Sequence, residues 1–245
     1  LAPQTEELAA FYAEQGFKGL LSKTQLPRQD LRPESAKTPE KTLPQHDLFG
    51  DLFSQENAPP QTVATQYETI YSQAQLDKWL DKIQAAKLTA LDTETTSLDP
   101  LAARIVGISL STELGQAAYI PLAHDYPGAP VQLPLDAVLQ QLKPWLEDAA
   151  QAKVGANTKY DSHVLANHGI TLRGWQHDVM LQSYVLEVHR PHGLESLAKR
   201  HIGREGMSYE YLCGKGVHQI GINQVDVEKA GQYACEDADY TLGVH

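Results

Sequence analysis

Cysteine, phenylalanine and methionine are scarce in this sequence, and long apolar runs are missing from it. The chain of 245 residues has 2 Cys, 4 Phe and 2 Met. Cys213 and Cys235 are too few for a disulfide framework, and they lack the C-x-x-C spacing of a metal site. No stretch approaches the roughly 20 apolar residues that span a bilayer, and the N-terminal residues lack the layout of a secretory signal. We therefore expect a cytoplasmic protein that does not enter membranes.

Positive charge is also in short supply. The formal net charge is −11, from 20 Lys and Arg against 31 Asp and Glu. This balance argues against a protein that coats nucleic acid electrostatically. It does not exclude an enzyme that acts on nucleic acid, because bound divalent cations reverse the sign of the site that holds them. A broad electrostatic grip on a phosphodiester should then come from another part of the molecule.

Three segments of the chain differ in composition. Residues 1–25 have apolar side chains spaced for one helical face. Residues 26–66 hold six of the 14 prolines among Lys, Glu, Gln and Ser, a composition that buries little apolar surface and indicates a flexible linker. Residues 67–245 have the regular patterns of a folded domain. The chain begins at Leu1 rather than Met, and its last helical pattern runs to His245 without a stop signal, so we expect a fragment of a longer protein.

Strand and helix patterns alternate in the folded domain. The three strand candidates after the first helix are joined by short links that suit antiparallel neighbours. A meander of this kind, followed by a helical crossover, a further strand and more helices, makes an α/β layered domain. We expect strands at 67–72, 88–94, 104–112, 116–123 and 152–157, and helices at 74–86, 135–148, 159–169, 178–187, 193–202 and 225–244.

The stretch LDTETTSLDP places two carboxylates two residues apart at the end of a predicted strand. Side chains at i and i+2 of a strand project from the same face, so Asp92 and Glu94 would repel each other unless they lie in water or share a cation. Asp161 follows a buried strand at its junction with a helix, where the ligands of α/β sheets collect. Asp237 lies four residues after Tyr233 and so shares its helical face.

Each of these acids has an ordinary alternative role. Asp92 and Glu94 could belong to a strand that ends in a polar turn. Asp161 could interact with the free amides of a helix N-terminus, and Asp237 could be a solvated residue of an acid-rich helix. Their combination, in this order and on these elements, favours a site in which four carboxylates converge.

Three segments resemble the exonuclease motifs of the proofreading superfamily that has an Asp-Glu-Asp-Asp catalytic set. They are DTETTSLD, NTKYD and YACED, and the Tyr-x-x-x-Asp form of the third is that of the tyrosine branch. The flanking segments, including VGANTKYDSHVLANHGI and AGQYACEDADYTL, are similar to the 3′→5′ exonuclease domain of bacterial DNA polymerase I. The likeness covers about residues 67–245. Residues 1–25 resemble the tail of the preceding 5′-nuclease region, and residues 26–66 resemble the linker between the two.

This resemblance implies a ribonuclease H-like three-layer α/β fold, with a mixed central sheet and helices on both faces. It implies a 3′→5′ exodeoxyribonuclease that removes nucleotides from single-stranded or frayed DNA 3′ ends. It also implies a polymerase domain in cis, a monomer, and a place in the bacterial cytoplasm at the nucleoid. The implied cofactors are two Mg²⁺ or Mn²⁺ ions, which agrees with the preference of these hard cations for oxygen ligands.

The resemblance also implies roles for the acids. Asp92 would bridge both ions, Glu94 and Asp237 would complete the first ion site, and Asp161 would hold the second ion. Tyr233 would orient the attacking water, because a phenol that is neutral at pH 7 suits orientation rather than proton abstraction.

Three further residues are implied as substrate contacts. Leu98 would wedge between the last two bases, Tyr209 would stack on one of them, and Asn157 would hydrogen-bond the terminal nucleotide. Ala156 stands where relatives have a side-chain amide, which puts one family contact in doubt. Leu98 could otherwise be a core residue at a strand end, and Tyr209 a surface aromatic.

Two other functions stay open at this stage. One is a stand-alone RNA-trimming exonuclease of the same tyrosine branch. The other is a catalytically inactive scaffold that only positions a polymerase, which the presence of all four acids disfavours.

Overall fold

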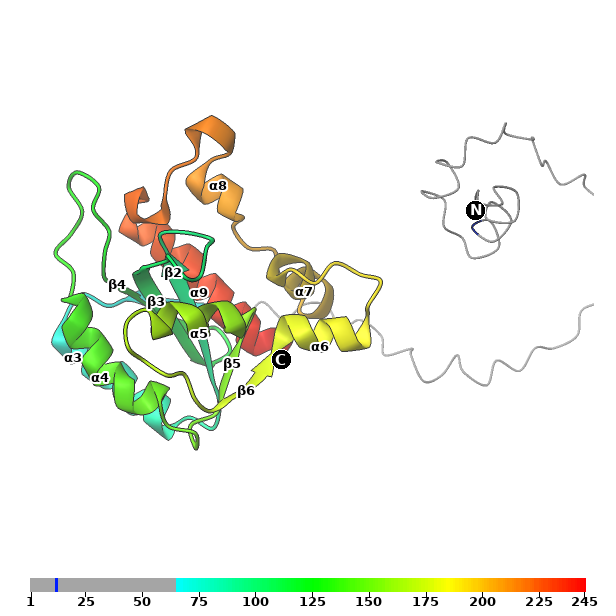
Figure 1. Cartoon of the computed structure of the whole chain (residues 1–245), viewed down its shortest axis with the longest axis horizontal. Coiled ribbons are helices and arrows are strands. Elements are labelled where there is room, and N and C mark those ends of the chain that lie inside the picture. Colours follow the sequence, from blue (N-terminus) through cyan, green and yellow to red (C-terminus); the bar gives the residue numbers. More distant parts are fainter. Residues whose placement is uncertain (1–11, 13–64) are drawn as a thin grey trace, which may run out of the picture. The chain divides into compact units, whose positions relative to one another are not determined.

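A six-stranded sheet with helices on both faces forms the part of the chain that the structure describes from residue 65 on (Figure 1). The computed structural model describes residues 65–245 and, before them, Tyr12 alone, which is helical. The predictions for residues 1–25 and 26–66 therefore lie outside the described residues, apart from Tyr12 and the last two residues of the linker. Residues 65–245 belong to one compact unit. None of the helices in this described part is long and apolar enough to cross a membrane.

The elements follow the predicted order closely. The strands are β1 (Gln66–Thr69), β2 (Thr89–Thr95), β3 (Ile105–Glu113), β4 (Gln116–Pro121), β5 (Lys153–Gly155) and β6 (Trp175–Asp178). The α-helices are α3 (Gln73–Ala85), α4 (Leu135–Leu146), α5 (Thr158–Ala166), α6 (Val179–Leu186), α7 (Leu194–His201), α8 (Tyr209–Cys213) and α9 (Val227–Val244). Two short 3₁₀ turns are η2 (Gly216–His218) and η3 (Ile222–Gln224).

The sheet is mixed, and its strand order is β1-β4-β3-β2-β5-β6. The predicted meander is confirmed, because β3 pairs antiparallel with both β2 and β4. β1 joins this meander parallel to β4, and β5 and β6 extend it in parallel on the other side of β2. β2 therefore lies inside the sheet, with its side chains facing a helical layer on each side.

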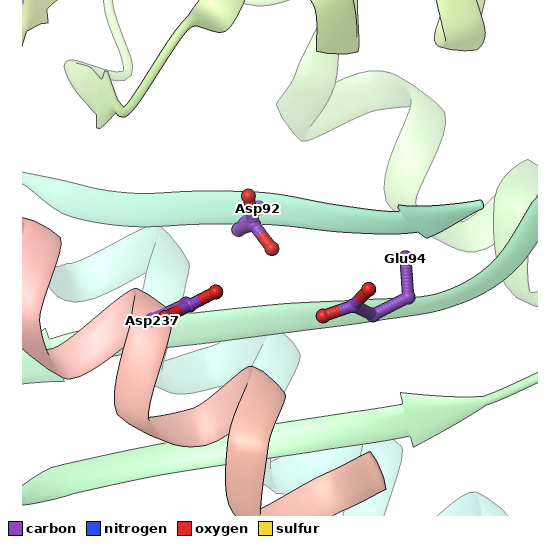
Figure 2. Close-up of side chains that lie close together, drawn as sticks. All are labelled: Asp92, Glu94 and Asp237. Atoms are coloured by element: carbon purple, nitrogen blue, oxygen red, sulfur yellow. The ribbon is translucent and has the colours of Figure 1, made fainter. Parts of the chain in front are cut away.

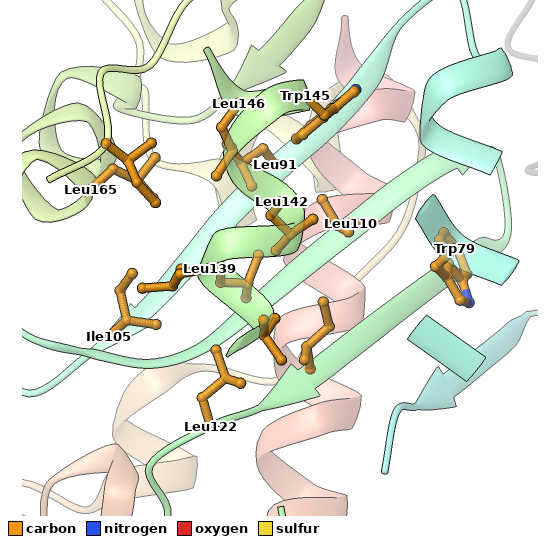
Figure 3. Close-up of a cluster of buried hydrophobic side chains, with 14 of the residues drawn as sticks. Trp79, Leu91, Ile105, Leu110, Leu122, Leu139, Leu142, Trp145, Leu146 and Leu165 are labelled. Atoms are coloured by element: carbon orange, nitrogen blue, oxygen red, sulfur yellow. The ribbon is translucent and has the colours of Figure 1, made fainter. Parts of the chain in front are cut away.

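One face of the sheet is covered by α3, α4 and α5 (Figure 3). The sheet-facing side chains of α4, among them Leu139, Leu142 and Leu146, pack with Leu91 of β2 and Leu110 of β3. These helices present an apolar stripe every three to four residues, which is the pattern that predicted them. Burial of this stripe is the main source of stability for the layer.

The opposite face is covered by α9, which contacts β1 to β5. Its small residues Ala230 and Ala234 pack against Val106 of β3 and Tyr119 of β4. Small side chains let the helix backbone approach the sheet closely. α6 and α7 cover the β5 end of the same face, where Val179 and Leu197 pack with Ala90 and Val154. The chain thus has three layers, as expected from the sequence.

Asp178, the last residue of β6, caps two helices at once. Its carboxylate accepts hydrogen bonds from the Met180 and Leu181 amides of α6, at 3.0 and 3.2 Å, and from the Thr158 amide of α5, at 2.8 Å. Only 6% of Asp178 is exposed. Because capping satisfies amides that a helix leaves unpaired, this residue fixes the beginning of α5 against the edge of the sheet.

Candidate active site

β2 supplies two acids to the α9 face of the sheet. Asp92 and Glu94 alternate with Leu91 and Thr93 along the strand, so the acids face α9 while the other two face the α5 side. Glu94 is 7% exposed and Asp92 is partly buried. The sheet, rather than a solvated turn, therefore holds both carboxylates.

α9 brings the third acid to the same place. The ligand oxygens of Asp92, Glu94 and Asp237 lie within 4.8 Å of one another. Figure 2 shows the three side chains in the space between β2 and α9. Tyr233, one helical turn before Asp237, lines a hollow that these three acids also line. Residues 92 and 237, which lie far apart in the sequence, are joined into one cluster by the packing of α9 across the sheet.

Asp161 lies at the edge of this cluster and does not belong to the group of three. It is 2% exposed, and its Oδ1 accepts a hydrogen bond of 2.6 Å from the Thr93 hydroxyl. It lines the same hollow of about 620 Å³ as Asp92, Glu94, Tyr233 and Asp237. The structure thus brings all five predicted catalytic residues to one hollow but gathers only three acids into a tight cluster.

Burial and mutual repulsion raise the proton affinity of the acids. Burial raises the pKa of Asp92 to about 6. Burial first, and then the charge of Asp92, raises the pKa of Glu94, of Asp161 and of Asp237 well above the ordinary values. A buried carboxylate with a like-charged neighbour favours its neutral form, so these groups compete for protons unless a cation lies among them.

The donor set fits a divalent cation. Glu94 Oε1 is buried and has no hydrogen-bond partner among the described residues, although buried polar atoms rarely remain unpaired. The three clustered side chains offer only carboxylate oxygens, the ligands that Mg²⁺ and Mn²⁺ prefer. None of the described side chains that line the hollow is Lys, Arg or His, so the hollow itself supplies no positive side-chain charge to a phosphate.

The three predicted substrate contacts also line this hollow. Leu98, on the connection from β2 to β3, is 92% exposed. Asn157 is the only residue other than glycine in the described part with a left-handed backbone, at φ 68°. The ring of Tyr209 lies 6.3 Å from that of Tyr233 in an edge-on arrangement. An exposed leucine at the rim is not a core residue, which was the alternative for Leu98.

A protein-family model described as 3′-5′ exonuclease matches residues 67–245. The chain belongs to the 3′-5′ exonuclease family. Its sequence is 42% identical to DNA polymerase I of Pseudomonas aeruginosa over 246 residues, which is 99% of this chain and 25% of that protein. It is 38% identical to DNA polymerase I of Rhizobium leguminosarum over 195 residues, 72% of this chain and 19% of that protein. The exonuclease chain thus spans a quarter or less of the length of these relatives.

Solved structures share the fold of this exonuclease. RNase D of Trypanosoma brucei has a TM-score of 0.57 at 17% identity, over 73% of this chain and 62% of that chain. NrnC of Brucella melitensis has a TM-score of 0.53 at 19% identity, over 74% of this chain and 78% of that chain. At such identities the likeness shows the fold alone, and the ribonuclease H-like fold implied by the sequence is confirmed.

Three residues of the candidate site are not predicted by the sequence. The Thr93 hydroxyl donates a hydrogen bond to Asp161. The alternation of side chains along β2 could have placed Thr93 on the α5 side of the sheet. Tyr160 donates its hydroxyl to the Ser97 carbonyl, next to Leu98, and so ties the rim to α5. Ile220, beyond η2, lines the hollow and is 44% exposed; no pattern in the sequence points to it.

Gly107 of β3, which pairs with Glu94, leaves room for the ring of Tyr119 behind the site. A Cβ at this position would lie 2.2 Å from the Tyr119 hydroxyl. The Tyr119 hydroxyl lies 2.7 Å from His124 Nε2, while His124 Nδ1 lies 3.1 Å from the Val225 carbonyl. The buried ring of Tyr119 therefore occupies the space that a side chain at residue 107 would need.

Gly107→Ala is expected to lower the free energy of unfolding by about 1–3 kcal/mol, the usual cost of overpacking a core, and to slow the nuclease by displacing Tyr119 beside Glu94. Urea denaturation and the rate of nucleotide release measure the two effects. Gly193→Ala is the matched control, because a Cβ there meets nothing within 4 Å. Equal stability of the two variants would contradict the close packing of Tyr119 on Gly107.

Proposed function

We propose that this chain is the proofreading exonuclease domain of a DNA polymerase I. It hydrolyses the terminal phosphodiester of single-stranded or frayed DNA 3′ ends with two divalent cations, Mg²⁺ or Mn²⁺, and releases nucleoside 5′-monophosphates. The observation that carries the proposal is the cluster of Asp92, Glu94 and Asp237, with an unpaired Glu94 oxygen, in a hollow without positive side chains. Buried carboxylates this close repel one another unless a proton or a cation compensates their charge, so the cluster supports a site that takes up cations.

The acids divide the work of holding the two ions. Asp92 would be shared by both ions, Glu94 and Asp237 would complete the first site, and Asp161 would contribute to the second. When bound, the ions supply Lewis acidity, a water made nucleophilic at neutral pH and compensation of phosphate charge. Thr93 holds the Asp161 carboxylate in place by its hydrogen bond.

Tyr233 is suited to orient the attacking water. Burial, followed by the charges of Asp237, Glu94 and Asp92, raises the pKa of Tyr233 above its ordinary value. The phenol therefore stays protonated at neutral pH and acts as a hydrogen-bonding group rather than a base. Its place one helical turn from Asp237 directs the hydroxyl into the hollow.

The rim of the hollow would select a single-stranded end. Leu98 would enter between the last two bases, Tyr209 would stack on one of them, and Asn157 would contact the terminal nucleotide. Stacking of a base on an aromatic ring contributes about 1–3 kcal/mol without sequence preference. A paired terminus cannot offer its bases in this way, so frayed ends are preferred.

The proposal also includes a polymerase domain in the same polypeptide and a location in the cell. The DNA polymerase I relatives are at least four times the length matched here, which supports a polymerase domain in cis. We place the protein as a monomer in the bacterial cytoplasm, at the nucleoid. Broad contacts to the DNA backbone would come from the polymerase domain, since the net charge of this chain is −11.

RNA trimming is the second candidate function. The structural neighbours include RNase D of Trypanosoma brucei in complex with RNA U12 and NrnC of Brucella melitensis bound to pGG. These proteins share the fold with this chain. Its acidic cluster would act on a phosphodiester, a group that DNA and RNA have in common. The inactive-scaffold alternative is disfavoured, because the clustered acids keep an unpaired oxygen that a scaffold has no use for.

The test compares matched DNA and RNA. A 5′-labelled 20-nucleotide single strand of each kind is incubated with the protein in Mg²⁺, Mn²⁺ or EDTA, and the products are resolved by length. We expect stepwise shortening of DNA from its 3′ end with either cation, slower shortening of RNA, no reaction in EDTA, and nucleoside 5′-monophosphate as product. Faster loss of RNA than DNA would favour the second candidate, and intact strands in Mn²⁺ would refute the proposal.

A further inference from the structure

The link between α7 and α8, residues 202–208, lies against the outer side of α9. The Met207 amide donates a hydrogen bond of 2.8 Å to Glu236 Oε2. A Cβ at Gly206 would lie 2.6 Å from the Tyr240 ring, so the link backbone touches α9 closely at this point. The guanidinium of Arg204 lies over the same ring, 4.6 Å from its centroid.

Arg204 of the link forms an ion pair with Asp239 of α9, a fully buried acid. Its Nη1 is 2.5 Å from Oδ2 of Asp239, which is 0% exposed. The same carboxylate accepts hydrogen bonds from the Tyr67 hydroxyl at 2.8 Å and from the Gly115 amide at 2.7 Å. Arg204 Nη2 also donates to the Tyr67 hydroxyl at 3.0 Å. One guanidinium thus connects the link to α9 and β1 through two donors and a position over the Tyr240 ring.

Only arginine can make this set of contacts. A lysine ammonium has no planar fork, and it cannot pair with Asp239, reach Tyr67 and cover the Tyr240 ring at the same time. Asp239 itself needs a partner, because an ionised carboxylate that is buried without one is strongly destabilising. The contact is therefore specific to the residue and not only to its charge.

The link leads directly to a residue of the hollow. Ser208 begins α8, where its hydroxyl accepts a hydrogen bond of 3.2 Å from the Tyr211 amide, and Tyr209 is the first residue of that helix. α8 has five residues, too few for a stable helix on its own. Its place beside α9 therefore depends both on its own packing, through Cys213 and Leu212, and on what holds the link before it.

We propose that Arg204 is a positioning residue: its ion pair with Asp239 holds the link on α9 and so sets Tyr209 beside Tyr233 to receive a base of the 3′ end. The inference rests on the proposed function, because it takes Tyr209 as a substrate contact. α9 serves as the common reference. It carries Tyr233 and Asp237 toward the hollow and Asp239 toward Arg204, so the distance from the stacking ring to the acids is set along one helix.

The test uses the double variant R204M/D239N. Arg204→Met alone would leave Asp239 buried without a counter-charge and would disturb folding for that reason only. With both charges removed, we expect a folded protein in which KM for single-stranded DNA rises about fivefold or more, the low end of what the loss of one base stack gives. We expect kcat in saturating Mn²⁺ to stay within about twofold, since the acid cluster is unchanged.

Two further variants distinguish a positioning role of Arg204 from a general loss of stability. In a Tyr209→Ala background the double change should raise KM by less than about twofold more, because residues that act through one another are not additive. K199M/E205Q is the matched control. It removes another ion pair between α7 and the same link, at 2.5 Å, but with side chains 70% and 71% exposed; its KM should equal that of the wild type.

Arg204→Lys keeps the charge and is expected to melt near the wild-type temperature while its KM still rises. An unchanged KM in R204M/D239N, or a rise fully additive with Tyr209→Ala, would overturn the inference and leave the proposed function standing. A wild-type protein that does not degrade DNA would overturn the proposed function, and this inference with it.

Discussion

Asp237→Asn is expected to lower the rate of 3′-end hydrolysis about a thousandfold or more while the protein stays folded. The amide keeps the size of the carboxyl group but removes one negative charge from the cluster with Asp92 and Glu94. Charge compensation by bound cations is worth several kcal/mol in the transition state, and about 4 kcal/mol corresponds to a thousandfold in rate. Single-turnover release of nucleotide from labelled DNA in Mn²⁺ measures the effect.

The matched control lies on the same helix. Glu228→Gln is also an acid-to-amide change in α9, but Glu228 is exposed and accepts a hydrogen bond of 2.7 Å from the Tyr71 hydroxyl away from the hollow. Its rate should stay within about twofold of the wild type, because exposed polar contacts contribute little. Full activity in Asp237→Asn, or equal loss in both variants, would remove the acid cluster from the mechanism.

Asp92→Asn should stabilise the protein when divalent cations are absent. Burial raises the pKa of Asp92 from 3.8 to about 6. An acid whose pKa is higher in the folded state contributes stability at low pH that is lost as the pH rises through the folded-state value. For Asp92 this loss amounts to about 3 kcal/mol between roughly pH 4 and pH 6. The asparagine variant lacks the charge and should not show this loss.

The measurement is the free energy of unfolding in urea with EDTA, as a function of pH. The two proteins should agree near pH 4, and the variant should be the more stable above pH 6. The raised pKa values of Glu94, Asp161 and Asp237 extend the decline of the wild type above pH 6. Added Mn²⁺ should restore the wild type and leave the variant nearly unchanged. If the variant is less stable than the wild type at pH 8 in EDTA, ionised Asp92 does not destabilise the fold and this account is wrong.

The sequence predicts the main elements of the fold and two of the three clustered acids from patterns that depend on local periodicity. β2 alternates, α4 and α9 repeat every three to four residues, and their observed bounds differ from the predicted ones by two residues at most. The shared face of Asp92 and Glu94 follows from the alternation of one strand. That Asp237 meets them required the motif resemblance, since no local rule places α9 over β2.

Other features depend on contacts between distant residues and could not be predicted. β6 has the sequence WQHD, in which only Asp178 is buried, so it has no apolar alternation to reveal a strand. Helical periodicity puts Asp239 on a different face from Asp237, but it cannot identify the partner Arg204, which lies 35 residues away. The hydrogen bond from Thr93 to Asp161 spans 68 residues. Side-chain partners of this kind emerge only after the layers have packed.

The two-sided use of α9 has a consequence for how this domain can change in evolution. An α-helix turns by about 100° per residue. One residue inserted or deleted between Tyr233 and Asp237 would swing Asp237 out of the acid cluster and, in the same step, take Asp239 out of reach of Arg204. A substitution in α9 can affect the acid cluster or the ion pair with Arg204 separately. A change in the length of the helix disrupts both together. Insertions and deletions among relatives should therefore be absent from this helix.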